Sequence, residues 1–240
     1  MEESRLPPER PRENLGARRL GRLGFLGLLG AGTATLFYGR AISHATSRIT
    51  NPVSDATGLT RLIPSGGWRI YTVADTMPTF DRETWRLRID GLVAKPVDLS
   101  YEQLRALPKA EQVSTFHCVT GWIVTNVRWG GVRFHDLLAA ASPLPSAHAI
   151  HFVSAEVPYD DYLDLKQVSL PDVMLAYEMN GKPLAREHGA PVRVVIPDMY
   201  GYKNVKWVKE IRLVSTPGSG YWEQRGYDVD AWVGKSNGYG

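Results

Sequence analysis

The only cysteine of the chain, Cys118, lies in a segment whose residue types are suited to chemistry. Residues 116–122 read Phe-His-Cys-Val-Thr-Gly-Trp, and Trp-Gly-Gly-Val follows at 129–132. A thiolate is a soft metal ligand, and its direction is fixed when it stands at the end of a strand. The same residue types are compatible with a cysteine nucleophile that pairs with His117 or His135, or with a small buried hydrophobe. A single cysteine excludes an intrachain disulfide and any metal cluster built from several cysteines of this chain.

Short apolar and alternating segments predict the elements that position this cysteine. Strands are expected at 85–91, 112–116, 150–153, 192–196 and 205–214, and the second of these leads into Cys118. A turn is expected at Gly130 and Gly131, a strand that passes into a helix at 132–141, and a helix at 172–179. Ser100 and Gln103 form a capping-box pattern, which predicts a short helix that stops at Pro108. Because no βαβ alternation is present, the sequence predicts a mixed α+β domain with more strand than helix.

Charge is unevenly distributed along the chain. Residues 1–50 contain eight Lys and Arg against four acids, whereas residues 51–240 contain 20 against 21. A nucleic-acid-binding domain needs a basic face on its folded part. Nucleic acid is therefore not an expected partner.

Residues 1–45 are predicted to be an export signal. Arg18 and Arg19 precede a weakly apolar run at 23–39, which is followed by small residues up to position 45. The pair resembles a twin-arginine signal, although Gly21 and Arg22 stand where large apolar residues usually follow. The alternative is an uncleaved membrane anchor. We expect an exported, periplasmic protein with a linker at 46–67 and a catalytic domain at 68–240.

Three segments together resemble the molybdopterin-binding domain of the sulfite oxidase family. They are residues 116–122, residues 129–132 and Gly-Ala-Pro-Val-Arg at 189–193, and the likeness extends from about Trp68 to Trp222. The chain is most similar to the branch that contains the catalytic subunit of a periplasmic methionine-sulfoxide reductase. The resemblance implies a strand-rich α+β fold of the sulfite oxidase type, an oxidoreductase activity and a molybdenum–molybdopterin cofactor.

The resemblance also implies roles for individual residues. Cys118 would be the thiolate ligand of molybdenum and the catalytic residue, and Arg193 would bind the phosphate of the cofactor with its planar guanidinium. The loop at 200–206 would complete the phosphate cradle with main-chain N–H groups and a lysine. The other implied cofactor contacts are Thr72, Asp75, Thr76, Ser154, His188, Asn204, Val205 and Lys206. Of these, His188 replaces an asparagine and Ser154 a threonine of the reductase branch.

Several of these residues also have a purely structural interpretation. Arg193 would then pair with an acid across the sheet, and Lys203 and Lys206 would lie on a solvated strand face. Trp122 and Trp129 would be either core aromatics or pocket walls. His117 and His135 are given no role.

The segment that follows the cysteine bears on the substrate. Sulfite oxidases carry arginines there, because a divalent oxyanion needs countercharge, whereas residues 119–124 are uncharged and Arg128 is the first cation. This favours reduction of a sulfoxide-type substrate, either small or protein-bound. No immunoglobulin-like dimerisation domain is expected after residue 228 and no haem motif is found, so electrons are expected from a membrane haem protein or another redox partner. The alternatives are a sulfite-oxidising enzyme, a cofactor-free binding module and a cysteine hydrolase.

Overall fold

The computed structural model describes residues 67–234. The predicted export signal at 1–45 and the linker, apart from residue 67, lie outside the described residues. Within 67–234, no helix has both the length and the apolar character needed to cross a membrane.

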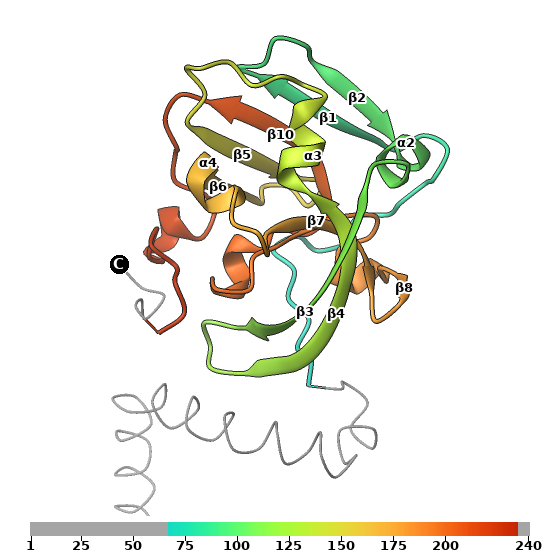
Figure 1. Cartoon of the computed structure of the whole chain (residues 1–240). Helices are drawn as coiled ribbons and strands as arrows, with labels where there is room; N and C mark the ends of the chain where they lie inside the picture. Colours follow the sequence, from blue (N-terminus) through green and yellow to red (C-terminus); the bar gives the residue numbers. More distant parts are fainter. Residues whose placement is uncertain (1–66, 235–240) are drawn as a thin grey trace, which may run out of the picture. The chain divides into compact units, whose positions relative to one another are not determined.

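Two five-stranded β-sheets form the framework of the domain (Figure 1). The first sheet has the order β2-β1-β10-β5-β6 and is antiparallel except between β1 and β10. Its strands are β1 (Arg86–Gly91), β2 (Val97–Ser100), β5 (Ala149–Ser154), β6 (Asp160–Asp164) and β10 (Val208–Val214).

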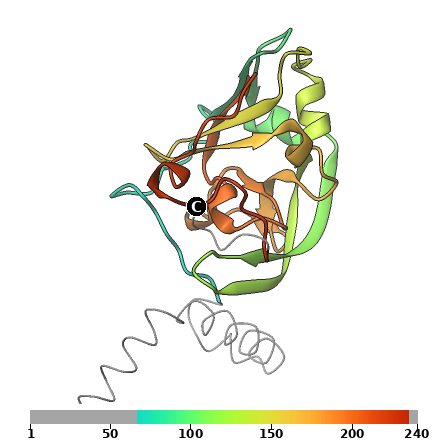
Figure 2. The same cartoon turned by 90° about the vertical axis from the view of Figure 1, so that its left-hand side faces the viewer.

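The second sheet has the order β3-β4-β7-β8, with β9 paired to β7, and all its pairs are antiparallel. Its strands are β3 (Lys109–His117), β4 (Ile123–Arg133), β7 (Met174–Met179), β8 (Lys182–Pro183) and β9 (Arg193–Val195). In Figure 2 the long β3–β4 hairpin curves along one side of the domain. Cys118 lies in the loop that joins these two strands.

Short helices connect the strands. They are α2 (Tyr101–Arg105), α3 (Phe134–Ala139), α4 (Leu165–Val168) and the 3₁₀ turns η2 (Arg186–His188), η3 (Gly201–Lys203) and η4 (Glu223–Arg225). The predicted capping box of α2 is confirmed: Ser100 Oγ accepts from Gln103 N at 3.2 Å, and Ser100 N donates to Gln103 Oε1 at 2.8 Å. Two orphan N–H groups at the start of the helix are thereby satisfied.

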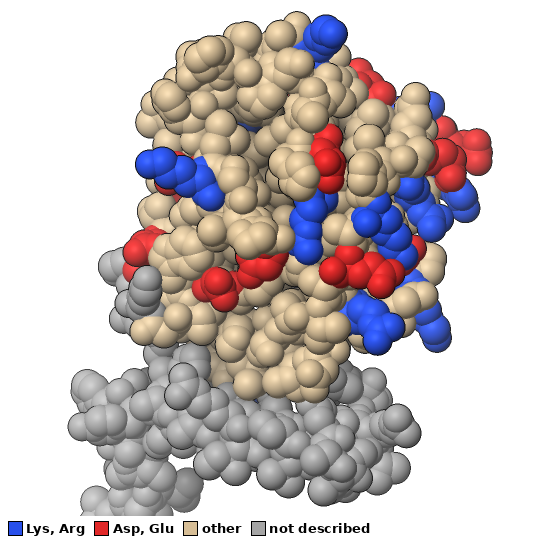
Figure 3. Space-filling view, in the orientation of Figure 1, with Lys and Arg blue, Asp and Glu red and all other residues tan. Residues whose placement is uncertain are grey.

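The hydrophobic core follows the alternation of the strands. Leu87 and Ile89 of β1 are fully buried, whereas Arg88 between them is exposed. On β10, Ile211 is fully buried and the next residue, Arg212, is exposed. On the face shown in Figure 3, acidic and basic side chains are interspersed rather than gathered by sign. The strand-rich α+β fold agrees with the prediction.

Two predicted local structures are wrong. The segment expected to be a helix at 172–179 is strand β7, and its residues from Met174 to Tyr177 are all buried. A strand covered on both faces shows a continuous apolar run, which periodicity cannot distinguish from a buried helix. The turn expected at Gly130 and Gly131 lies inside β4. A Cβ atom at Gly131 would lie 2.2 Å from Leu175 O, so the glycine allows β7 to approach.

Candidate functional site

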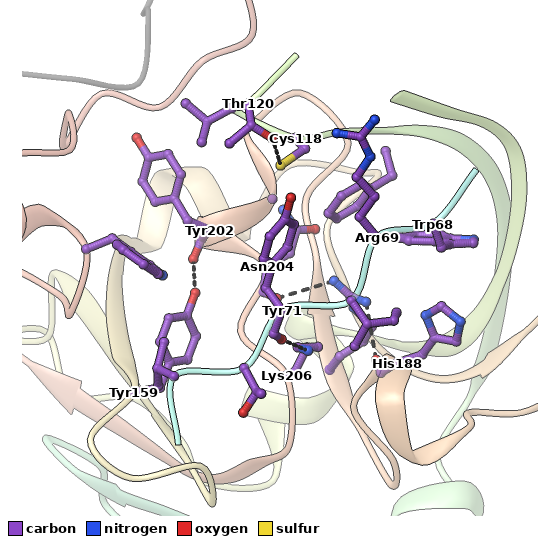
Figure 4. A pocket seen from close by; sticks show the side chains of 18 of the residues that line it. Trp68, Arg69, Tyr71, Cys118, Thr120, Tyr159, His188, Tyr202, Asn204 and Lys206 are labelled. Carbon is purple, nitrogen blue, oxygen red and sulfur yellow. Dashed lines mark hydrogen bonds between the residues drawn. The ribbon is translucent and has the colours of Figure 1, made fainter. Parts of the chain in front are cut away.

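A pocket of about 220 Å³ opens beside Cys118 (Figure 4). Six consecutive residues, 68–73, form one wall, and we call them the strap. The other walls come from the β3–β4 loop, residues 156 and 159, residues 187–206 and the C-terminal residues 222 and 227. The pocket therefore joins segments that are far apart in the sequence.

The β3–β4 loop fixes the direction of Cys118. Cys118 N donates to Trp122 O at 2.9 Å, and Gly121, at a φ of 97°, donates to Cys118 O at 3.0 Å. The half-buried Sγ lies 3.2 Å from Thr120 Oγ1. Burial raises the pKa of the Cys118 thiol, and the hydrogen bonds of Thr120 and the charge of Arg69 offset this only in part. The thiolate form therefore needs a further positive charge, which a bound metal supplies.

Arg193 is a buried cation with no carboxylate partner among residues 67–234. Its guanidinium N–H groups donate at 3.2 to 3.4 Å to the main-chain carbonyls of His188, Val194 and Asn204. The guanidinium also lies over the rings of Phe116 and Trp129, at 5.6 and 5.3 Å from their centroids. Burial lowers the pKa of Arg193 to about 10. An acid partner across the sheet, the structural alternative for Arg193, is not found within the described part.

Lys206 is a second cation of the pocket. Its Nζ donates to Tyr71 O at 2.7 Å and to Glu187 O at 3.4 Å, and it lies 4.0 Å from the ring centroid of Trp207. Burial, followed by the nearby charge of Arg193, lowers the pKa of Lys206 to about 8. An anion bound between the two cations would remove this penalty.

Lys203 has a different environment. It is 1% exposed and forms ion pairs with Asp161, at 2.7 Å, and with Glu223. Burial alone would lower the pKa of Lys203, but the two carboxylates raise it above its ordinary value. Lys203 is thus neither a solvated residue nor a cation available to a ligand.

Two buried polar atoms of the pocket have no hydrogen-bond partner within the described residues. They are His188 Nδ1 and Trp122 Nε1. Burial and the charge of Arg193 lower the pKa of His188 to about 4, so its imidazole is neutral at pH 7. Unpaired buried polar atoms are costly, and a polar ligand would satisfy them.

The strap is tied to the pocket wall by Glu156. The buried carboxylate accepts from Thr72 Oγ1, from Val73 N at 2.7 Å and from Ala74 N at 3.4 Å. Ser154 Oγ in turn accepts from Glu156 N at 2.9 Å and donates to Lys206 O at 2.8 Å. Ser154 therefore holds two residues of the pocket wall without lining the pocket itself.

The structure brings together six of the predicted site residues. Cys118, Thr72, His188, Arg193, Asn204 and Lys206 all line the pocket. The other four do not line it: Asp75 and Thr76 are exposed beyond the strap, and Ser154 and Val205 are buried behind the wall. Of the two tryptophans, Trp122 lines the pocket, whereas Trp129 is a core residue.

Sequence reasoning missed several residues of the wall, namely Arg69, Tyr71, Glu156 and Tyr159. The most consequential is Arg69, whose charge acts on the Cys118 thiol. Arg128, the first cation after the cysteine in the sequence, is exposed on β4 and does not line the pocket. The sequence hypothesis considered only the uncharged residues that follow the cysteine along the chain, and Arg69 is a cation that lies near the thiol in space.

The arrangement fits a cofactor that carries a metal at one end and a phosphate at the other. Cys118 offers a soft ligand, while the buried Arg193 and the partly buried Lys206 offer positive charge that forms no ion pair with a carboxylate among residues 67–234. The unpaired atoms of His188 and Trp122 offer hydrogen bonds to its polar groups. These features match the molybdenum–molybdopterin that the sequence resemblance implies.

Comparison with known proteins agrees with this assignment. The family model of the oxidoreductase molybdopterin binding domain matches residues 74–222. An uncharacterized oxidoreductase of Bacillus subtilis, YuiH, is 38% identical over 159 residues, which cover 63% of this chain and 77% of that protein. Sulfite oxidase of Arabidopsis thaliana is 31% identical over 181 residues, which cover 61% of this chain and 46% of that protein.

Two further proteins are similar. The protein-methionine-sulfoxide reductase catalytic subunit MsrP of Gluconobacter oxydans is 35% identical over 153 residues, covering 57% of this chain and 49% of that protein. The crystal structure of the sulfane dehydrogenase SoxCD from Paracoccus pantotrophus matches with a TM-score of 0.56 and 27% identity. That match covers 59% of this chain and 41% of the SoxCD chain. The chain thus spans less than half the length of three of these four proteins.

Proposed function

Since the chain belongs to the family of oxidoreductases with a molybdopterin-binding domain, we propose that it catalyses oxygen-atom transfer and reduces a sulfoxide-type substrate. It is an oxidoreductase with a strand-rich fold of the sulfite oxidase type, and molybdenum–molybdopterin is its cofactor. When bound, the cofactor supplies the two-electron redox chemistry that side chains lack.

In this proposal the chain's own residues hold the cofactor and shape the space around the reacting sulfur. Cys118 binds the metal, and Arg193 and Lys206 bind the phosphate at the opposite end of the pocket. The neutral His188 offers Nδ1 to a polar edge of the cofactor. The ring of the buried Trp122 packs edge-on against the ring of Trp68. Trp122 thereby helps to exclude water from the end of the pocket that holds the metal.

One observation carries the choice of substrate. The wall next to Cys118 consists of Phe116, Val119, Thr120 and Trp122, none of which is charged, and Arg69 is an exposed cation at its rim. A divalent sulfite ion that enters this space loses hydration, and the single exposed charge of Arg69 compensates for this loss only in part. A neutral sulfoxide has no such penalty. The relative named as a methionine-sulfoxide reductase subunit supports this preference.

We expect the holoenzyme with an artificial electron donor to reduce a sulfoxide at least about a hundredfold better than it oxidises sulfite. A difference of about 2.7 kcal/mol in activation free energy gives this factor, and a partly desolvated, underpaired anion costs several kcal/mol. Steady-state kcat/KM values for both substrates at matched pH measure it. Efficient sulfite oxidation without sulfoxide reduction would show that the pocket is built for the anion, and the chain would then be a sulfite-oxidising enzyme.

Electron supply and location are further parts of the proposal. The Gluconobacter relative is named as a catalytic subunit, which supports a separate redox partner, either a membrane haem protein or another carrier. Residues 1–45 are an export signal, 46–67 a linker and 68–240 the oxidoreductase domain in this proposal. Twin-arginine export moves folded proteins, so it suits an enzyme whose cofactor is inserted in the cytoplasm.

Replacing both Arg18 and Arg19 with lysine is expected to retain the protein in the cytoplasm. Twin-arginine recognition requires the guanidinium pair, and a lysine pair preserves only the charge. Fractionation of the native host, followed by immunoblotting, measures the distribution. Arg10→Lys with Arg12→Lys is the matched control, because it changes two nearby arginines outside the pair. Undiminished export of the protein with Arg18→Lys and Arg19→Lys would instead indicate the general secretion route or a membrane anchor.

A further inference from the structure

Arg69 differs from the other two cations of the pocket. Arg193 is buried and Lys206 is partly buried, and both donate to main-chain carbonyls. Arg69 is exposed, and no hydrogen bond or ion pair occupies its guanidinium among residues 67–234. It is therefore the pocket cation that is available to a molecule arriving from solvent.

The backbone on both sides of Arg69 is anchored. The Trp68 ring packs at 4.9 Å against the Phe116 ring and at 4.9 Å against the His188 ring. Two positions further on, Tyr71 O accepts from Lys206 Nζ. The strap thus fixes the Cα of Arg69 at the rim, and only the side chain remains to be ordered when a ligand binds.

Arg69 lies at the metal end of the pocket. Figure 4 shows its side chain next to Cys118 and Thr120, whereas Lys206 and His188 lie on the opposite side. Its charge acts on the Cys118 thiol, which also indicates proximity. A phosphate held by Arg193 and Lys206 therefore does not reach Arg69, and its partner is a different molecule.

We propose that Arg69 is a specificity-determining residue that binds a carboxylate of the substrate, so that the enzyme prefers carboxylate-bearing sulfoxides to neutral ones. This rests on the proposed function. A guanidinium forms two parallel hydrogen bonds to a carboxylate. The Tyr71 ring, 53% exposed and stacked on Trp122 at 6.5 Å, offers an apolar surface to the alkyl chain between the carboxylate and the sulfur. A substrate with its sulfur near Cys118 and its carboxylate at the rim of the pocket would contact both the Arg69 guanidinium and the Tyr71 ring.

The test compares two sulfoxides that differ only at the carboxyl group, N-acetylmethionine sulfoxide, which is an anion, and its neutral methyl ester. The wild-type holoenzyme is expected to have a kcat/KM about tenfold higher for the acid, which corresponds to about 1.4 kcal/mol. Arg69→Gln is expected to remove this preference, mainly by raising KM for the acid. Arg69→Lys keeps the charge but cannot form two parallel hydrogen bonds to a carboxylate, so it is expected to retain part of the preference. Arg128→Gln, which removes an exposed arginine outside the pocket, is expected to behave as wild type.

Binding without an electron donor separates this inference from the proposed function. Both sulfoxides are titrated into each holoenzyme, and the change in tryptophan fluorescence, to which the pocket residues Trp68, Trp122 and Trp222 contribute, reports binding. Tighter binding of the acid that depends on Arg69, but without turnover, would support the inference and contradict the proposed reaction. Turnover with equal kcat/KM for acid and ester, or equal losses for both in Arg69→Gln, would overturn the inference and leave the reaction standing. Selective loss of sulfite oxidation in Arg69→Gln, without discrimination between acid and ester, would also overturn it.

Discussion

Replacing Cys118 with serine is expected to lower oxygen-atom transfer by at least about a thousandfold, or about 4 kcal/mol in activation free energy, and to leave the protein folded. A hydroxyl is a harder and more weakly acidic ligand than a thiol, so it is a poor substitute at a metal that takes a thiolate. The fold is expected to tolerate the change, because the volume difference is small. The hydrogen bonds that close the loop, from Cys118 N to Trp122 O and from Gly121 N to Cys118 O, involve the main chain only.

Three measurements on the Cys118→Ser protein separate the possible roles of the thiol. Sulfoxide reduction with an artificial donor measures activity, elemental and pterin analysis measure cofactor content, and a melting curve measures the fold. An unchanged melting temperature with lost activity supports the role as metal ligand. Activity at the wild-type level would contradict it.

The parts of the fold that were predicted correctly are those encoded by local patterns. The capping box at Ser100 and Gln103 and the alternation of Leu87 and Ile89 each involve residues within a few positions of one another. The sequence of strand β7 resembles that of a buried helix, because the strand pairs that define it come from elsewhere in the chain: β4 and β9 pair with it along its two edges. Local periodicity contains no information about such neighbours.

The site was predictable to the extent that its residues lie in motifs. Cys118 and Arg193 were found through the short segments that contain them, and both line the pocket. Arg69 and Glu156 were not found, because their roles arise from contacts across the fold: the strap folds over the pocket, and Glu156 holds it from 82 to 84 positions away. Sequence order also indicates Arg128 as the nearest cation to the cysteine, although Arg69 is the pocket cation whose charge acts on the thiol.

Replacing Arg193 is expected to weaken cofactor binding strongly. The variant Arg193→Met, which nearly conserves the side-chain volume, tests this better than Arg193→Ala. Arg193→Ala would also leave a cavity between the Phe116 and Trp129 rings, which the guanidinium now covers. Either variant is expected to weaken cofactor binding by roughly 2–5 kcal/mol, because a buried phosphate would lose a charge-assisted partner. That corresponds to a loss of roughly 30-fold to several thousandfold in affinity. Pterin and molybdenum content, measured after equilibration with limiting cofactor, reports the change.

The stability of the apoprotein distinguishes phosphate binding by Arg193 from a purely structural role. Burial without a carboxylate lowers the pKa of Arg193 to about 10, so its charge is held at a cost when no anion is bound. If Arg193 serves the phosphate, Arg193→Met is expected to change the melting temperature of the apoprotein little and to lose most of the stabilisation that the bound cofactor adds. Arg186→Met is the matched control, because Arg186 also donates to main-chain carbonyls, those of Met77 and Pro78, but does not line the pocket. A large loss of apoprotein stability with unchanged cofactor affinity in Arg193→Met would make Arg193 a residue of the sheet and leave Lys206 as the cation for the phosphate.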